Sequence, residues 1–145
     1  MSNHYNNIPS QMCGIIDAID IQKPVVGKVY RVSKSGKKDG ETFFNTYSEI
    51  LNGTTGKNKD LNDPGTYSTS VYLVSGPCEK FVKFLAKKYR DKYPSPAVIV
   101  GNIEPDDGRA QRTIERLPHY DDPNHVDWWI YAGKESEIAE RFDFY

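Results

Sequence analysis

Three short groups of residues in this 145-residue chain carry side chains that can do chemistry. Arg31 stands within an otherwise apolar stretch, where a guanidinium can hold anionic oxygen atoms. A Ser-Thr-Ser run occupies residues 68–70. Glu135 and Glu137 flank one serine near the C-terminus. If these two acids lie on a strand, both side chains point to the same face, and a carboxylate there can stabilise positive charge that develops on a substrate.

Each group also has an ordinary structural explanation. Arginine is common in edge strands, and Ser and Thr often begin strands. Glu135 and Glu137 can also be two solvent-facing acids at the head of a C-terminal strand. The order Arg, Ser-Thr-Ser, Glu-x-Glu along one chain is more specific than any of its parts.

The elements that must position these side chains can be predicted from the spacing of apolar residues. Apolar spacing of three and four, with Pro77 as a start signal, predicts a helix over residues 75–93, and a shorter helix is predicted over 41–53. Residues 104–124 are predicted to be a polar connection with one helical turn. Strands are predicted at Val25–Val32, Thr66–Val74, Ala97–Ile103, 125–133 and 140–145.

This order of elements indicates the fold class, because the strands gather late in the chain instead of alternating regularly with helices. It favours an α+β fold. Residues 1–24 are expected to form a lead-in segment, and residues 25–145 a single domain. Trp128 and Trp129 are expected to alternate between core and surface.

Composition excludes several classes of protein. The chain is 37% hydrophobic with a formal charge of −1, which is globular and gives no general electrostatic attraction to nucleic acid or anionic membranes. We expect a soluble protein, because no apolar run approaches the roughly 20 residues of a membrane helix and the polar N-terminus has no signal-peptide core. Secretion, or injection into the cytoplasm of a target cell, stays open. Cys13 and Cys78 are expected to be free buried thiols.

Two other groups of residues suggest different chemistry. The segment "HYDDPNHVD" offers metal-ligand types, but its spacing matches no closed metal site and favours a hydrophilic loop. His119 and His125, with Lys134, could instead serve a small nuclease by acid–base catalysis. The predicted helix over residues 75–93 carries many lysines, which favour a solvated outer face over a nucleic-acid surface.

Across about residues 25–145, the chain resembles the NAD-dependent ADP-ribosyltransferases of the Arg / Ser-Thr-Ser / Glu class, which include cholera-, pertussis- and pierisin-like enzymes. The resemblance is carried by "VYRV", "ETFFNTYSEI", "NKDLND", "YSTS", "CEKFVKFLAKKY", "AVIVGNIEPDDG" and "ESEIAERF". It implies a split mixed β-sheet core of two packed small sheets with flanking helices.

The resemblance also implies an activity. A mono-ADP-ribosyltransferase, acting as a toxin or effector, would cleave the nicotinamide–ribose bond of NAD without a metal. It would transfer ADP-ribose to an acceptor, first of all a protein arginine and secondly nucleic acid or a small molecule. An immunity or inhibitor protein would be a further partner. The alternatives are an NAD glycohydrolase, a nuclease, and a non-enzymatic binding domain.

The resemblance assigns roles to individual residues. Glu137 would be the catalytic acid, Glu135 would orient the acceptor, and Arg31 would hold the pyrophosphate or ribose of NAD. Tyr131 and Lys134 would contact the acceptor. The residues expected to bind NAD are Arg31, Ser68, Thr69, Ser70, Tyr72 and Phe81.

Overall fold

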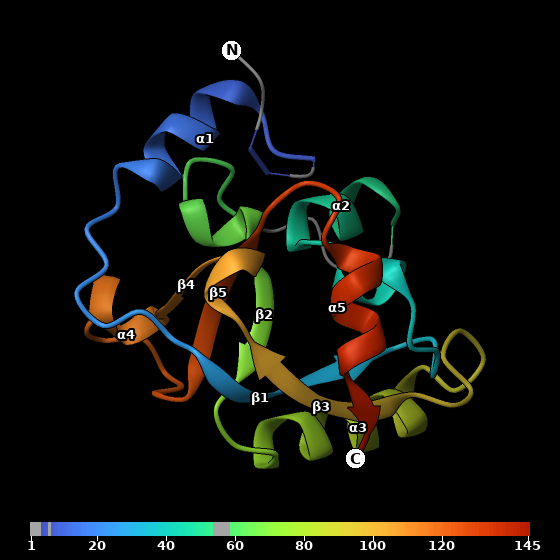
Figure 1. Ribbon diagram of the computed structural model, residues 1–145. Helices are drawn as coiled ribbons and strands as arrows, with labels where there is room; N and C mark the ends of the chain where they lie inside the picture. The colour runs from blue at the N-terminus through green and yellow to red at the C-terminus, as the bar shows by residue number, and fades with distance from the viewer. Residues whose placement is uncertain (1–3, 6, 54–58) are drawn as a thin grey trace.

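The computed structural model describes residues 4–5, 7–53 and 59–145, which form an α+β fold built on a single antiparallel sheet (Figure 1). The expected α+β class is therefore confirmed. The strand order is β4-β5-β2-β1-β3-β6. The strands are β1 (Gly27–Ser33), β2 (Thr69–Tyr72), β3 (Ala97–Ile103), β4 (Gly108–Arg112), β5 (His125–Ile130) and β6 (Asp143–Phe144).

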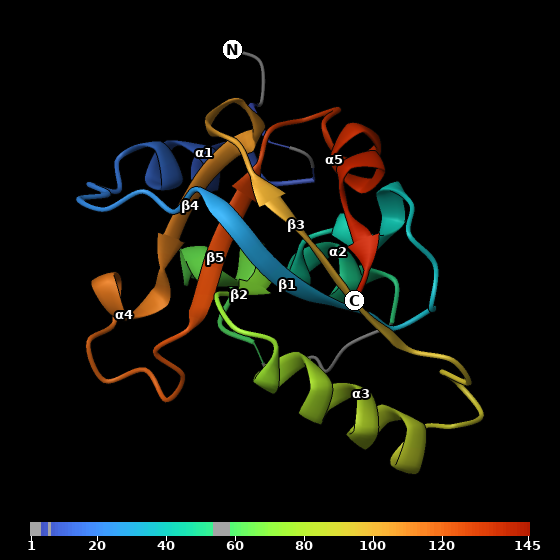
Figure 2. The same cartoon turned by 60° about the horizontal axis from the view of Figure 1, so that its bottom comes forward.

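Five α-helices and three short 3-10 helices of the described residues surround this sheet. In both views α1 and α3 lie at opposite ends of the molecule (Figures 1 and 2). The helices are α1 (Ser10–Asp17), α2 (Thr46–Leu51), α3 (Gly76–Lys88), α4 (Thr113–Arg116) and α5 (Glu135–Arg141), with 3-10 turns η1 (Gly40–Phe43), η2 (Pro64–Tyr67) and η3 (Pro105–Asp107).

The sheet narrows in its middle, between β1 and β2. These strands join at one register pair, Tyr30 opposite Tyr72, whereas β1 and β3 pair along the whole of Gly27–Ser33. The strands thus fall into two halves, β4-β5-β2 and β1-β3-β6, that remain one sheet. The expectation of two packed small sheets with mixed strand directions differs from this arrangement, since every pairing of the described strands is antiparallel.

The two tryptophans of β5 show how the sheet is covered on both faces. Trp128 packs with Phe43 and Phe142 in the main core, and its neighbour Trp129 belongs to a second cluster with Tyr5 and Tyr67. Successive side chains of a strand point to opposite faces. Both tryptophans are fully buried, so the expected alternation between core and surface is wrong. The second face of β5 is covered by the N-terminal segment.

This N-terminal lead-in is tied to the rest of the chain by hydrogen bonds as well as by apolar contacts. Arg109 of β4 donates to the carbonyl of Ile19, and Glu115 accepts from the backbone N–H of Gln22 at 2.8 Å. Isolated bridges add Tyr5 opposite Tyr131 and Pro24 opposite residue 111. The lead-in therefore supplies part of the molecule's core.

Several predicted elements are confirmed and others need correction. The strand at Ala97–Ile103 is found as predicted, and α3 begins next to Pro77. The predicted helix over 41–53 is broken into η1 and α2, because Asn45 adopts an extended conformation and caps α2 through Ser48 N–H. The polar segment 104–124 contains strand β4, which was not predicted. Of the expected strand over 140–145, the first two residues belong to the end of helix α5, and only β6 is a strand.

Candidate functional site

The two C-terminal acids do not share a strand face. Glu135 and Glu137 lie in the first turn of α5, and residues two apart on a helix point in different directions. The Glu137 side chain is 60% exposed and pairs with Lys134 at 3.1 Å. Glu135 is buried where α5 packs on η1, beside Gly40. The expectation that both acids lie on one strand face is therefore wrong, because this segment is helical.

Tyr131 and Lys134, which were expected to contact the acceptor, pack against other parts of the protein. The Tyr131 ring packs on the ring of Tyr5 at 5.5 Å between centroids, at the contact with the lead-in. Lys134 forms its ion pair with Glu137. These contacts place Tyr131 and Lys134 against the lead-in and α5.

Arg31, in contrast, reaches into the narrow middle of the sheet. Its guanidinium donates to the backbone carbonyls of Ser70 at 2.6 Å, Thr42 at 2.7 Å and Phe44 at 3.3 Å. The side chain is 7% exposed, and burial lowers its pKa below the ordinary arginine value, partly offset by the nearby charge of Glu49. A guanidinium has five N–H donors, and three of them bond to these carbonyls of the described residues.

The Ser-Thr-Ser run lies beside Arg31 and contributes differently at each position. The Ser68 hydroxyl lies between two acceptors, the carbonyl of Gly65 at 2.8 Å and Oδ1 of Asp127 at 2.9 Å, and Thr69 donates to the carbonyl of Phe43. Both are buried, so they brace β2. Ser70 alone lines the open groove.

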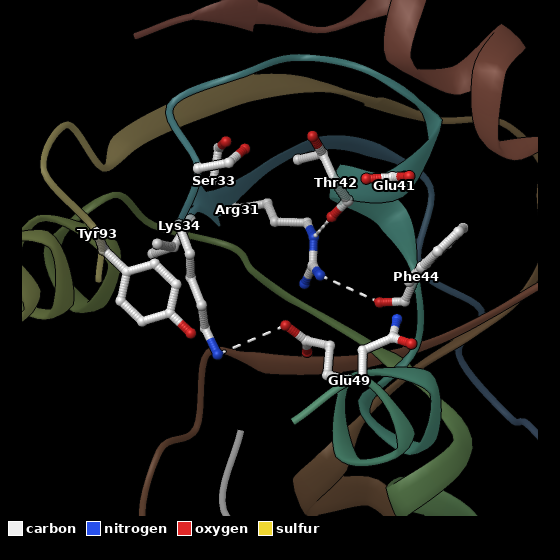
Figure 3. Close-up of a pocket in the computed structure, with 11 residues that line it drawn as sticks. Arg31, Ser33, Lys34, Glu41, Thr42, Phe44, Glu49 and Tyr93 are labelled. Carbon is white, nitrogen blue, oxygen red and sulfur yellow. Dashed lines mark hydrogen bonds and ion pairs between the residues drawn. The ribbon is translucent and has the colours of Figure 1, made fainter. Parts of the chain in front are cut away.

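This groove runs across the middle of the sheet as three adjoining cavities. The first, of about 430 Å³, is lined by Arg31, Lys34, Glu41 and Glu49 (Figure 3). The second shares Arg31 and Glu49 with the first and adds Ser70. The third, of about 270 Å³, is lined by residues of β2, α4 and β5 together with Lys59.

Basic and acidic side chains together line the first part of the groove. Figure 3 shows Arg31 directed from β1 toward the backbone of Thr42 and Phe44, and Lys34 paired with Glu49 across the cavity. The nitrogen–oxygen distance of that pair is 3.5 Å. Tyr72, expected to bind NAD, lines the second and third cavities, and Phe81 lines the second but stacks on Phe84 of α3.

The third cavity contains a chain of hydrogen bonds that the sequence did not predict as a unit. The Ser70 hydroxyl lies 3.0 Å from Nε2 of His125, and Nδ1 of His125 lies 2.6 Å from the Thr113 hydroxyl. That hydroxyl lies 3.1 Å from Oδ2 of Asp127, which also accepts from Arg116 at 2.9 Å. We call Ser70, His125, Thr113 and Asp127 the relay. A signal for it existed, since His125 and Asp127 alternate with apolar residues in one strand.

The surroundings of His125 favour the neutral form of its ring. Burial lowers its pKa below the ordinary histidine value, outweighing the opposite effect of Asp127 and Asp122. The rings of Tyr72 and Tyr120 both lie 5.2 Å from the His125 ring. A neutral imidazole can accept a proton, so the arrangement can assist a reaction that releases one.

The residues considered for a nuclease site or a metal site do not come together in the described structure. His119 is exposed in a turn, whereas His125 is buried in the groove wall. In the part of the chain that the structure describes, no three His, Cys, Asp or Glu side chains gather as metal ligands. Nor is any described helix long and apolar enough to cross a membrane. Cys13 and Cys78 are buried thiols outside any disulfide of the described residues.

Comparisons with models of known protein families, with curated proteins and with solved structures found no match to this chain.

Proposed function

We propose that the groove binds NAD and cleaves its nicotinamide–ribose bond, transferring ADP-ribose to an acceptor. The acceptor proposed first is a protein arginine. The observation that carries the proposal is the buried guanidinium of Arg31, which bonds to backbone carbonyls beside Ser70 and faces an open cavity. Fixed positive charge at the floor of a groove is suited to a dinucleotide pyrophosphate.

The resemblance to ADP-ribosyltransferases adds support, because it assigns Arg31 and the Ser-Thr-Ser run to one NAD site. Here β1 and β2 are neighbours, and Arg31 donates to the carbonyl of Ser70 across them. Lys34 and Lys59 line the same groove and add positive charge for phosphates. The proposal keeps the activity expected from the resemblance but moves it away from Glu135 and Glu137.

A different acid is proposed to act at the ribose. Glu49 lines the first two cavities, is partly buried, and is the carboxylate whose charge most favours the protonated form of Arg31. Asp127 already accepts hydrogen bonds from Ser68, Thr113 and Arg116. When the glycosidic bond breaks, its electron pair leaves with nicotinamide, and a carboxylate stabilises the positive ribose. The acceptor then bonds to the ribose carbon and loses a proton.

Nicotinamide release from NAD by purified protein tests this proposal, with and without an arginine-rich protein acceptor. Glu49→Gln should slow release by at least about 100-fold, because the charge opposite the developing cation is lost. Glu137→Gln is the matched control, and it should retain the wild-type rate because that side chain is exposed and does not line the Arg31 cavity.

Three outcomes distinguish a transferase, a glycohydrolase and a catalytic site at α5. Release that needs Glu49 and labels the acceptor supports the transferase, and release without labelling supports the glycohydrolase instead. Loss of activity in Glu137→Gln with retention in Glu49→Gln would return the site to α5. Calorimetry that detects no NAD binding to the wild-type protein would overturn the proposal.

A further inference from the structure

The relay at the far end of the groove has features that NAD binding at Arg31 does not require. Ser70 is half-buried, and it lines both the second and the third cavity, so its hydroxyl is reachable from the groove. Its oxygen lies 3.0 Å from Nε2 of His125. A serine hydroxyl beside the nitrogen of an oriented imidazole is the arrangement that activates serine as a nucleophile.

The direction of each hydrogen bond in the relay follows from its last member. Asp127 pairs with Arg116, so its carboxylate accepts, and the Thr113 hydroxyl must donate to it. The Thr113 oxygen then accepts from Nδ1–H of His125, which leaves Nε2 as the unprotonated nitrogen. Nε2 therefore accepts a hydrogen bond from the Ser70 hydroxyl.

We propose that Ser70 is a nucleophile activated by His125 and that the third cavity hydrolyses small esters that carry an anionic group. The Ser70 oxygen attacks the ester carbonyl carbon while its proton passes to Nε2 of His125. The carbon–oxygen bond of the ester breaks, and the leaving alcohol takes that proton, which leaves an acyl group on Ser70. Water then attacks the acyl carbon and loses a proton to Nε2, and return of this proton to the Ser70 oxygen releases the acid.

The cavity walls define the class of substrate. A volume of about 270 Å³ fits a small molecule, and the rings of Tyr72 and Tyr120 beside His125 provide flat apolar walls. Lys59 and Arg116 line the same cavity. Arg116 is already paired with Asp127, whereas Lys59 stands at an exposed position, from which its ammonium group can bind the anionic group of the ester.

Thr113 and Asp127 are positioning residues in this proposal, because they act through His125. They fix the tautomer that exposes a lone pair to Ser70. Removing the Thr113 hydroxyl should therefore change the pH dependence of the reaction as well as its rate. The charged or titratable groups that face His125 are Asp127, Asp122, Lys59, Arg116, Tyr72 and Tyr120.

Labelling of the wild-type protein with an alkyl fluorophosphonate tests the nucleophile. This assay needs no NAD. The serine oxygen attacks phosphorus, fluoride leaves, and the proton passes to His125. We expect one adduct per native chain, mapped by peptide mass spectrometry to Ser70, and none after denaturation. An absent adduct, or one on a different serine, would overturn the proposal without bearing on NAD cleavage.

Variants then test the relay. Ser70→Ala should abolish labelling, His125→Gln should slow it at least about 100-fold, and Ser136→Ala on α5 should leave it unchanged. Thr113→Ser should retain the wild-type pH profile that Thr113→Val loses.

Hydrolysis of para-nitrophenyl hemisuccinate should exceed that of the neutral para-nitrophenyl acetate, and Lys59→Gln should remove this preference. Equal rates on both esters in the wild-type protein would contradict the anionic substrate class.

Discussion

At the scale of single residues, Arg31 combines a structural and a proposed binding task. Its guanidinium satisfies three carbonyls where β1 and β2 separate. We expect Arg31→Met to lower the free energy of unfolding by about 2–4 kcal/mol, because buried carbonyls then lose their donors. Urea denaturation measures this change. The control Arg90→Met, at an exposed position, should stay within about 0.5 kcal/mol. Equal effects of both would mean that Arg31 has no structural task.

Cys78 lends itself to a second prediction at this scale. Its side chain is fully buried, and burial raises the pKa of the thiol to about 12. The reactive thiolate is then rare near neutral pH. In the native protein we expect Cys78 to resist a disulfide-exchange reagent over the time in which urea-unfolded protein reacts fully. Fast modification of native Cys78, mapped by peptide analysis, would contradict this burial.

At the scale of elements, the docking of the C-terminal segment depends on one glycine of β3. A Cβ at Gly101 would collide with the ring of Phe142, which packs in the main core. We expect Gly101→Ala to destabilise the protein by about 1–3 kcal/mol in thermal unfolding, because the core must shift. Gly76→Ala is the matched control, since no atom lies near its added Cβ, and it should be neutral or slightly stabilising.

The same scale shows what the sequence can predict. The strand β3 and the helix α3 follow from an apolar run and from Pro77. The strand β4 has the polar sequence GRAQR, and it is a strand because Gly108–Arg112 pairs with β5, which local propensity cannot reveal. The acids of α5 were misplaced because the aromatic end of the chain suggested a strand, whereas buried Ile138, Ala139 and Phe142 follow helical spacing.

The candidate site was predictable only in part, for a related reason. Arg31 and Ser70 were identified by type and order, and they do meet. The relay joins Ser70 with His125, 55 positions later in the chain. Their distance is set by the β2–β5 register, with Tyr72 opposite His125 and Ser70 opposite Asp127. The amino-acid sequence alone does not specify this register, because it does not show which strands pair or how they are aligned.

At the scale of the whole molecule, the buried His125 makes folding depend on pH. Its pKa in the folded protein lies below the ordinary value of about 6.5, which the unfolded chain retains. Between the two values the unfolded chain binds more protons, so stability is complete above the unfolded pKa and falls as pH decreases toward the folded pKa.

We therefore expect the free energy of unfolding to decrease by up to about 1.4 kcal/mol per pH unit from this residue alone as pH falls below 6.5. His125→Gln should flatten that part of the profile, and His119→Gln, at an exposed position, should not. Urea unfolding at a series of pH values measures both. If the free energy of unfolding fell equally with pH in wild type and His125→Gln, another group would control stability below pH 6.5.

The lead-in before β1 is a further determinant of the whole molecule's stability. It contributes Tyr5, Ile8, Met12 and Ile16 to the cluster around Trp129. Each buried side chain of this size contributes about 1.5–3 kcal/mol, so a chain of residues 25–145 should lose at least about 5 kcal/mol of unfolding free energy. Because small domains have only about 5–15 kcal/mol in total, such a chain should be largely unfolded at room temperature.

Tryptophan fluorescence is the measurement suited to this prediction, because Trp129 lies under the lead-in while Trp128 lies in the other core. Truncation should shift the emission to longer wavelength. Tyr5→Phe removes only the hydroxyl that donates to Asp17 at 2.6 Å, so it should keep the wild-type spectrum with a smaller loss of stability. If the truncated chain unfolded at the wild-type urea midpoint, residues 25–145 would hold the sheet and the groove without their N-terminal cover.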